Sequence, residues 1–508
     1  MSTDIDVLII GSGPAGATFA RHLADRTTAR ILMVDTGSAL TSDTGGNIRN
    51  LMPEAREQAW GQARTFPLAA IPHDAPADVL QARPGTHLLN PLATATPLHQ
   101  GMPAAAMSSN IGGMGIHWTC ACPRPSGSER ISFLDQTRLD AAYETAEAYL
   151  QVTQQGFPAT ALSQSIIAAL NDRFSDGRDA TRLAQPMPLA CTPQPDGKPR
   201  WSGTDAILGD LARAEVRARR GLEIRPDTLC RQILTRDGVA SGAMLRHLPS
   251  GRDYEVHASV VVIAADALRT PQLLYASGIR PQALGRWLND QPQVIALIDV
   301  DAPARPNAKA GSTQDGRDNV SGVTWLPFNE PDFPFHGQLM QMDTSPIAFH
   351  QNDKDVGKPV VGLGLFLAKD LREDDRIMFS DERDALGMPR MTLSYTLTDA
   401  DRAGLEKALK AVQQVGAALN GVANGGEAII LPAGTSLHYQ GTHRMGPVDD
   451  GTCVTSPASR VWGFDNLYLG GNGSIPTATA CNPTLTSVAL ALMAADDIIE
   501  RFFPPHSL

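Results

Sequence analysis

The apolar residues near the N-terminus follow the pattern of a strand, a helix and a second strand. Residues 5–10, IDVLII, are short, branched and almost entirely apolar, which is typical of a parallel strand buried on both faces. A helical segment follows at 17–26, and a second apolar strand ends at Asp35. Residues 253–279 contain another strongly apolar strand, VVVIAA, followed by a helix that ends at Gly278. We expect this later strand to return to the sheet that the first strand begins.

The C-terminal half of the chain predicts a different kind of domain. Strand-like runs occur at 360–368 and 390–398, and an amphipathic helix follows at 400–419. Residues 302–334 are rich in Pro, Asn, Gly and Asp, so they predict a long surface connection. Earlier in the chain, residues 203–221 predict one helix. Strands with helices on one side favour an α+β domain beside the α/β domain.

The loop after the first strand, GSGPAG, has the G-x-G-x-x-G spacing of a dinucleotide-binding site. Gly11 permits the tight turn, Gly13 lets the backbone approach a pyrophosphate, and Gly16 lets helix and strand pack closely. The helix N-terminus then offers N–H groups and a positive dipole end to the phosphates. Asp35, 24 residues after Gly11, is expected to accept hydrogen bonds from the adenosine ribose hydroxyls. The motif alone does not distinguish FAD from NAD.

Composition places the chain among ordinary globular proteins and argues against some partners. It has 508 residues, of which 42% are hydrophobic and 19% are charged. A net charge of −11 argues against nucleic acid and anionic membrane surfaces. No stretch reaches the ~18 apolar residues of a membrane span, and the N-terminus does not have the pattern of a signal peptide. The six cysteines are too scattered for a disulfide framework, so we expect free thiols and a cytoplasmic protein.

Two histidines, His438 and His443, lie in the segment LHYQGTHRMG at 437–446. The alternatives are a pair of metal ligands, a structural pair, or a pair that includes a catalytic base. Zinc-binding histidines on a helix are usually four positions apart, whereas residues five apart on a strand point to opposite faces. Gly441 interrupts any regular element, and no cysteine or carboxylate in the segment completes a ligand set. We expect no metal site, and the structural and catalytic alternatives stay open at this point.

The last helix of the chain begins beside a run of small and polar residues. NLYLGG, from 466 to 471, predicts a short strand, and Pro483 suits the first turn of a helix. The helix carries an apolar stripe that includes Leu485, Val488 and Leu492. A plain packing helix explains this stripe. A helix N-terminus directed at a ligand would also explain the small residues before it, because its dipole favours negative charge there.

Five motifs occur in order along the chain: G-x-G-x-x-G at 11–16, GGMGIHW at 112–118, TPQLLYASGI at 270–279, H-x-x-G-T-x-R-M-G at 438–446 and NPTLT at 482–486. In this order they resemble the glucose–methanol–choline (GMC) family of FAD oxidoreductases. Within that family, GGMGIHWTCACP and LHYQGTHRMG are most similar to pyranose oxidases and to bacterial C-glycoside 3-oxidases. The resemblance implies an α/β FAD-binding Rossmann-like domain of the GMC type and an α+β substrate-binding domain.

The resemblance also implies how the chain divides into domains. The FAD-binding domain is expected to be discontinuous and to comprise residues 1–135, 205–286 and 430–508. The substrate-binding domain is expected to comprise residues 136–204 and 287–429. The connection after residue 300 is short for the features that build the tetramers of larger relatives, which favours a monomer or a small homo-oligomer.

The resemblance assigns the catalytic pair to His438 and Asn482, which would face the flavin ring together, and it gives His443 a structural role. A neutral imidazole near pH 7 is a suitable acceptor for the proton of an alcohol whose C–H gives a hydride to flavin N5. The Asn482 amide would donate a hydrogen bond to the oxygen as its charge develops. The start of the last helix would stabilise negative charge on the flavin.

The resemblance further implies which residues bind the cofactor. In pyranose oxidases the histidine that corresponds to His117 can be joined covalently to the flavin. The residues before it differ here, so we expect non-covalent FAD, with the covalent bond through His117 as the alternative. Thr119 is expected near flavin N5. The expected cofactor-binding residues are Gly11, Gly13, Gly16, Asp35, Gly113, His117, Trp118, Thr119, Gly471, Asn482 and Thr484.

The substrate-contacting residues are expected in HGQLMQMD at 336–343, the region where pyranose oxidases contact the sugar. Gln338, Gln341 and Asp343 are the polar candidates there. Met340 and Met342 depart from the pyranose oxidase pattern. They would suit an apolar entrance for a glycoside with a bulky aglycone, or they fill the core.

The expected activity is FAD-dependent oxidation of a secondary hydroxyl, at C2 or C3, of a pyranose sugar or glycoside to a keto sugar. The electrons would pass to O2 or a quinone. One alternative is FAD-dependent oxidation of a non-sugar alcohol, such as a polyol or a sterol-like compound. Others are an NAD(P)-linked reductase that shares the dinucleotide fold and a flavoprotein without catalytic activity, which the presence of both His438 and Asn482 disfavours.

Overall fold

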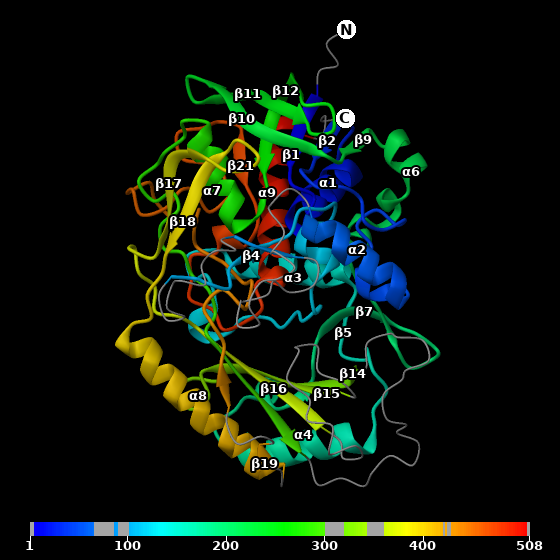
Figure 1. The fold of residues 1–508 in the computed structure, drawn as a ribbon, viewed down its shortest axis with the longest axis vertical. Coiled ribbons are helices and arrows are strands. Elements are labelled where there is room, and N and C mark those ends of the chain that lie inside the picture. Colours follow the sequence, from blue (N-terminus) through cyan, green and yellow to red (C-terminus); the bar gives the residue numbers. More distant parts are fainter. Residues whose placement is uncertain are drawn as a thin grey trace, which may run out of the picture.

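The fold is built around two large sheets at opposite ends of the molecule (Figure 1). A computed structural model describes residues 5–65, 86–89, 101–299, 320–342, 360–419, 422–423 and 428–504. The first sheet includes residues 5–10, and the C-terminal helix packs against it. The second sheet lies at the opposite end of the molecule. Within the described residues, none of the helices combines the length and the apolar character needed to cross a bilayer.

The first sheet has seven strands in the order β10-β11-β12-β1-β2-β9, with β21 also paired to β12. β1 pairs in parallel with β2 and with the second half of β12, so the later strand does return to the first sheet as the sequence predicts. The first half of β12 pairs in antiparallel fashion with β11. The strands are β1 (Ile5–Ile10), β2 (Ile31–Val34), β9 (Leu222–Arg225), β10 (Thr228–Arg236), β11 (Val239–His247), β12 (Arg252–Ile263) and β21 (Leu467–Leu469).

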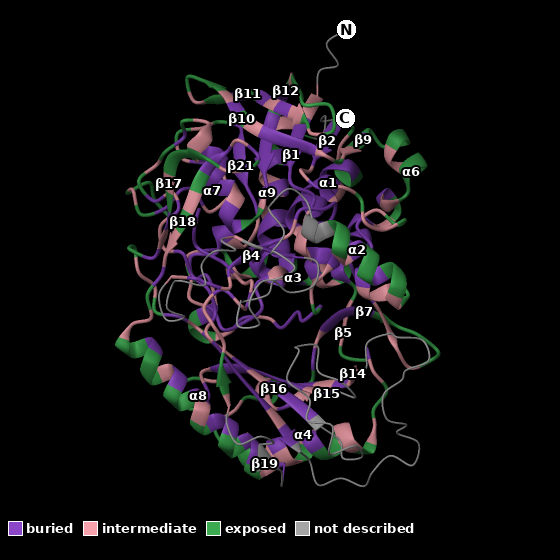
Figure 2. Cartoon of the chain, in the orientation of Figure 1, coloured by how far each residue is buried: buried purple, intermediate pink, exposed green. Residues whose placement is uncertain are grey.

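Alternate residues of β1 pack into two different cores. Val7 and Ile9 contact the cluster that holds α1 (Pro14–Arg26), α3 (Gln136–Leu150) and α9 (Thr484–Phe502). Leu8 and Ile10 contact apolar residues of β10 and β11 instead. Figure 2 shows β1 and α9 as buried along most of their length. Burial on both faces explains why residues 5–10 lack polar alternation.

Helix α3 packs with the first sheet, although residues 136–204 were expected in the other domain. Leu139, Tyr143 and Ala146 share the apolar cluster of α1 and α9. The Tyr143 hydroxyl also lies 3.0 Å from the Thr486 hydroxyl of α9. The expected boundary at residue 136 therefore does not match the packing, because the apolar stripe of α3 is buried against α9.

The second sheet is antiparallel and has the order β19-β13-β16-β15-β14-β6, with β20 also paired to β13. Its helix-covered face packs on α4 (Ala161–Phe174) and α8 (Asp399–Ala418). The exposed side of α8 faces outward in Figure 2. The strands are β6 (Gln185–Pro186), β13 (Gln293–Asp299), β14 (Val320–Leu326), β15 (Phe335–Met342), β16 (Val360–Leu367), β19 (Val422–Ala423) and β20 (Ile429–Ile430). The α+β character expected for this region is confirmed.

Two local predictions differ from the structure. The expected helix at 203–221 is broken into α5 (Thr204–Leu208), a 3-10 turn and α6 (Ala214–Arg219). Gly209 has φ +57, a left-handed conformation that interrupts the helix. Part of the expected connection at 302–334 is strand β14, whose Trp325 and Leu326 are buried on opposite faces. Residues 301–319 lie outside the described part of the chain.

The remaining elements are connections and small sheets. α7 (Asp266–Ala276) follows β12, as the sequence predicts, and packs against the hairpin of β17 (Arg376–Arg383) and β18 (Pro389–Ser394). The others are α2 (Pro53–Thr65), β3 (His87–Leu88), β4 (Ala106–Met107), β5 (Val152–Thr153), β7 (Leu189–Pro193) and β8 (Pro199–Trp201).

Candidate active site

A cavity runs from the carboxyl ends of β1, β2 and β12 to the loops that carry His438 and Asn482. All but one of the predicted cofactor-binding residues line it, namely Gly11, Gly13, Asp35, Gly113, His117, Trp118, Thr119, Gly471, Asn482 and Thr484, and so does His438. Gly16 is the exception. A Cβ at Gly16 would overlap the Gly11 carbonyl, so this glycine serves the close helix–strand packing expected of it.

Two helix N-termini open onto this cavity without a side-chain cap. Gly13 is the N-cap of α1 and Pro483 is the N-cap of α9, and neither end receives a side-chain hydrogen bond. The first N–H groups of both helices are available to a ligand, and the helix dipoles favour negative charge at both places. A bound molecule with anionic groups at two separated points fits this arrangement.

Asp35 lies at the end of the cavity near the glycine loop. One carboxylate oxygen accepts hydrogen bonds from the Ser12 N–H and hydroxyl at 2.9 and 2.6 Å, and the other accepts from the Gly37 N–H at 2.9 Å. Burial raises the pKa of Asp35, and these hydrogen bonds oppose the rise. A carboxylate has about four acceptor positions. Asp35 can therefore accept one further hydroxyl from a ligand.

His117 faces the middle of the cavity. Its Nε2 lies 2.8 Å from Asn110 Oδ1. The Asn110 Nδ2 donates to the carbonyls of Gly113 and Ile111, so the Asn110 oxygen must face the imidazole and Nε2 must carry the proton. Burial lowers the pKa of His117 to about 3, and its Nδ1 has no hydrogen-bond partner among the described residues. His117 is thus a neutral imidazole.

His438 is held in one tautomer by Gln291. The His438 Nδ1 lies 2.7 Å from Gln291 Oε1. The Gln291 Nε2 donates to the carbonyls of Thr479 and Cys481 at 2.9 and 2.7 Å, which directs the amide oxygen at the imidazole. In the neutral ring the proton is therefore on Nδ1, and Nε2 is the proton acceptor. The Phe366 ring stacks beside the His438 ring, and the two ring centroids are 5.7 Å apart.

Asn482 joins His438 to the second sheet. Its Nδ2 lies 3.4 Å from His438 Nε2, longer than a strong N–H···N hydrogen bond. Its Oδ1 accepts a hydrogen bond of 2.7 Å from Gln338 Nε2 on β15. The orientation of the amide is thus set, with the donor on the side of the imidazole. The two groups that the resemblance pairs are 44 positions apart and adjacent in space.

The loop before His438 is anchored by a buried aspartate. Asp290 accepts hydrogen bonds from the Ser436 hydroxyl and the Gly434 N–H, and the Ser436 oxygen accepts from the His438 N–H at 3.0 Å. Leu437 has φ +60, a conformation that a branched side chain rarely adopts. Strain of this kind persists where the surrounding contacts hold it, as they do here.

The candidates on β15 separate onto two faces. Gln338 faces the cavity side, whereas Gln341 is three positions further and therefore shares the helix-covered face with Leu339. The two amides cannot both contact the substrate, because strand side chains alternate. Asp343 lies outside the described residues. On the cavity-side face, Gln338 pairs with Gly364 of β16, where an added Cβ would meet only the Phe366 ring, at 3.6 Å.

His443 lies in the core and does not line the cavity. It is fully buried beside Gly473, and burial lowers its pKa to about 3. No group of three or more His, Cys, Asp or Glu side chains suitable for a metal ion occurs in the described part of the chain.

Gln291, Phe366 and Asp290 complete the site but carry no recognisable sequence signal. Gln291 and Asp290 belong to the short polar run NDQPQ before β13, which resembles an ordinary loop. Phe366 belongs to an apolar strand pattern. Their roles follow only from the residues that the fold brings next to them.

The cavity therefore combines a dinucleotide-binding end with an imidazole–carboxamide pair, which defines an oxidoreductase that binds a dinucleotide cofactor. Profiles of the GMC oxidoreductase family match residues 126–293 and 373–491. This chain belongs to the GMC oxidoreductase family, whose members bind FAD, and it is an FAD-dependent oxidoreductase. The NAD(P)-linked alternative is thereby removed.

Individual relatives narrow the comparison further. The chain is 44% identical to a C-glycoside 3-oxidase of Microbacterium trichothecenolyticum over 98% of this chain and 97% of that protein. It is 42% identical to a C-glycoside 3-oxidase of Arthrobacter globiformis, over 98% and 95%. It is 30% identical to a pyranose 2-oxidase of Tricholoma matsutake, over 97% and 93%. The fold is similar to a pyridoxine 4-oxidase structure (Mesorbium loti) with a TM-score of 0.67, 19% identity and coverage of 98% and 100%.

Proposed function

We propose that this protein oxidises a secondary hydroxyl of a pyranose glycoside to a ketone, with FAD as the hydride acceptor. The observation that supports this most directly is the 3.4 Å separation of His438 Nε2 and Asn482 Nδ2 at the cavity. An alcohol oxygen placed between them would meet one proton acceptor and one hydrogen-bond donor. That pair is what loss of the O–H proton requires, while FAD would accept the C–H hydrogen as hydride.

The residues of this chain would act at defined atoms. His438 takes the hydroxyl proton at Nε2, because Gln291 keeps the other ring proton on Nδ1. Asn482 donates from Nδ2 to the alcohol oxygen as it gains charge, while Gln338 holds the opposite end of the amide. Bound FAD supplies the hydride acceptor. The uncapped starts of α1 and α9 offer N–H groups to its phosphates and to its ring system.

The names of the relatives support a choice of sugar carbon. Two relatives above 40% identity are named C-glycoside 3-oxidases, and the pyranose 2-oxidase is more distant at 30%. We therefore favour oxidation at C3 of a C-glycoside over oxidation at C2 of a free pyranose. All three relatives are named oxidases, so O2 is the favoured electron acceptor and a quinone is the alternative.

We propose that the FAD is bound non-covalently. His117 uses Nε2–H to bind Asn110, and a bond from that nitrogen to the flavin would remove this hydrogen bond. Acid precipitation of the holoprotein should leave the yellow colour in the supernatant. Colour retained in the pellet would instead establish a covalent link.

The proposed function is tested by anaerobic reduction of the bound flavin. Purified holoprotein is mixed with C-glycosides, O-glycosides, free pyranoses and a non-sugar polyol, and the loss of flavin absorbance is followed. Glycosides should bleach the flavin fastest, and NMR of the product should show a ketone at C3. Fastest bleaching by the polyol, or none by any sugar, would reject the proposed substrate class.

A further inference from the structure

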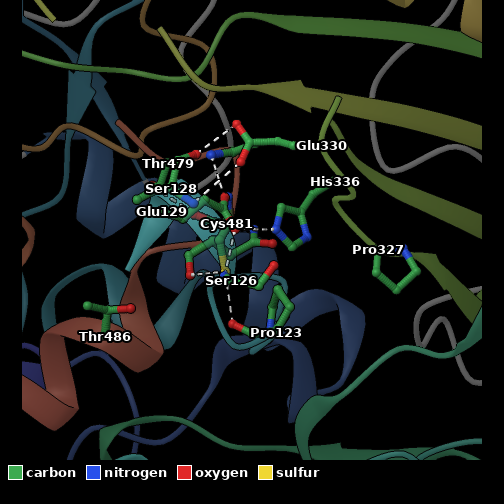
Figure 3. Close-up of polar contacts among 12 residues, drawn as sticks. Pro123, Ser126, Ser128, Glu129, Pro327, Glu330, His336, Thr479, Cys481 and Thr486 are labelled. Atoms are coloured by element: carbon green, nitrogen blue, oxygen red, sulfur yellow. Dashed lines mark hydrogen bonds and ion pairs between the residues drawn. The ribbon is translucent and has the colours of Figure 1, made fainter. Parts of the chain in front are cut away.

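A buried carboxylate and imidazole lie between the two sheets and have no part in the proposed proton transfer. Glu129 and His336 are 1% and 0% exposed. The Glu129 Oε2 lies 3.3 Å from His336 Nε2, and the two side chains point toward each other beside Cys481 (Figure 3). Buried ionisable groups carry a cost in desolvation, so a specific use is expected for them.

The protonation of His336 follows from its second neighbour. The Trp325 Nε1–H donates to His336 Nδ1 at 3.0 Å, so Nδ1 is the unprotonated nitrogen and Nε2 carries the proton. The ring stacks on Trp325 with an interplanar angle of 3° and on Phe328 with an angle of 17°. His336 is thus a neutral, rigidly packed donor that directs one N–H at Glu129.

The other contacts of Glu129 reach the loop that carries Asn482. Its Oε1 accepts hydrogen bonds from the Ala480 and Cys481 N–H groups, both at 2.9 Å. Its Oε2 also accepts from the Ser126 N–H at 3.1 Å. Burial raises the pKa of Glu129, while the hydrogen bonds from His336 and from the N–H groups of Ser126 and Cys481 lower it.

Glu129 thereby receives four N–H groups, and an ionised carboxylate has about four acceptor positions. A glutamine at this position would keep the shape but offer one acceptor oxygen and two N–H donors of its own. It could not satisfy all four partners. The contacts therefore specify a carboxylate and not merely a polar side chain of this size.

These contacts form a ring of interactions that includes the Asn482 amide. His336 is two residues before Gln338 on the same face of β15, and Gln338 binds Asn482 Oδ1 at 2.7 Å. Glu129 holds His336 on one side and the two residues before Asn482 on the other. This ring of interactions connects strand β15 of the second sheet to the loop at 480–482, which leads into α9.

We propose that Glu129 is a positioning residue that fixes the distance between strand β15 and the 480–482 loop. It thereby keeps the Asn482 amide within hydrogen-bonding distance of Gln338. The catalytic consequence rests on the proposed function, whereas the hydrogen-bonding consequence does not. Without the carboxylate, the Asn482 amide would lose its fixed position relative to His438.

The test compares Glu129→Gln with Glu330→Gln. Glu330 accepts from the Ser128 hydroxyl at 2.8 Å, an exposed contact between the segment that carries Glu129 and the turn before β15 (Figure 3), so it controls for loss of a carboxylate next to Glu129 that does not bind the 480–482 loop. In Glu129→Gln holoprotein, amide hydrogen exchange at 480 and 481 should become at least about tenfold faster, and flavin reduction by a C-glycoside should fall about tenfold to a hundredfold. Glu330→Gln should change neither.

A double variant separates positioning from general destabilisation. Glu129→Gln combined with Asn482→Ala should reduce the flavin no more slowly than Asn482→Ala alone, because both act through the same amide. Additive losses, or unchanged exchange at 480 and 481, would overturn the proposal. If wild-type flavin is not reduced by any glycoside while the exchange result holds, the proposed function fails and the anchoring role stands.

A second variant serves if Glu129→Gln does not yield folded holoprotein. His336→Phe keeps a flat ring beside Trp325 and Phe328 but removes the N–H directed at Glu129, together with the acceptor of the Trp325 Nε1–H. It should slow flavin reduction several-fold and leave the exchange at 480 and 481 near the wild-type value, since those N–H groups keep their acceptor. If His336→Phe reduced its flavin at the wild-type rate, the proposed link between β15 and the 480–482 loop would be rejected.

Discussion

The two sheets contribute to the site in different ways. The first sheet contributes glycines and helix starts from short contiguous segments, such as 11–16 and 482–486. The second sheet and its adjoining segments contribute single side chains that lie behind the cavity lining, each taken from an otherwise ordinary strand or loop. Gln338 contacts Asn482, and Gln291 and Phe366 contact His438.

The difference indicates what each region recognises. Backbone N–H groups, and glycines that let the backbone come close to a ligand, suit the phosphates and ring system of FAD, which all family members share. Side chains at the second sheet suit a substrate that differs among relatives. Changes near the second sheet should therefore alter turnover while FAD stays bound, and changes in the first region should act on stability or on FAD retention.

The largest effect is expected for His438, where both regions meet. His438→Ala removes the proton acceptor and should slow flavin reduction by about 10³-fold or more, within the range of general-base catalysis. The FAD absorbance of the purified protein should remain. Stopped-flow absorbance under anaerobic conditions measures the bound FAD and its rate of reduction. A reduction rate within tenfold of the wild-type rate would remove His438 from the mechanism.

A smaller loss is expected when the tautomer of His438 is no longer fixed. Gln291→Leu removes the acceptor of the Nδ1 proton and should slow flavin reduction about tenfold to a hundredfold. Gln341→Leu is the matched control, because this buried amide lies on the opposite face of β15 and has no hydrogen-bond partner among the described residues. Equal losses in both variants would contradict the role given to Gln291.

In the region around the first sheet, the buried His443 should make the folded protein less stable at acid pH. His443 is buried with a pKa of about 3, whereas an unfolded histidine titrates near 6.5. Above pH 6.5 neither state is protonated. Below it the unfolded state alone binds the proton, so stability falls by about 1.4 kcal/mol per pH unit, or about 2 kcal/mol at pH 5. His443→Asn should reduce the difference in unfolding free energy between pH 7 and pH 5, measured with urea, by that amount.

The smallest effect is expected at Gly364, which leaves space beside Gln338. Gly364→Leu should raise the KM for a glycoside about tenfold, as expected when a side chain fills a binding pocket, and leave the FAD spectrum unchanged. Gly364→Ala should have less effect, since a Cβ meets only the Phe366 ring. Loss of FAD from the leucine variant would contradict the division of roles between the two sheets.

The sequence by itself determined the nucleotide-binding half. The β1–α1–β2 order, the glycine spacing and the return of β12 to β1 all follow from local patterns, because strands buried on both faces and tight glycine turns leave continuous signatures. The motif order also brought out His438 and Asn482. Local patterns failed at Gly209, where a left-handed residue breaks the expected helix, and at β14, which looked like a connection.

Only the tertiary structure decided which side chains meet at the proposed catalytic pair, His438 and Asn482. Gln291 and His438 are 147 positions apart, and Gln338 and Asn482 are 144 apart. Their contacts depend on how one sheet is placed against the other and on which face each strand residue occupies, as the opposite sides taken by Gln338 and Gln341 show. Single polar residues at such distances leave no periodic signal, because the partner that gives each one its role is supplied by folding.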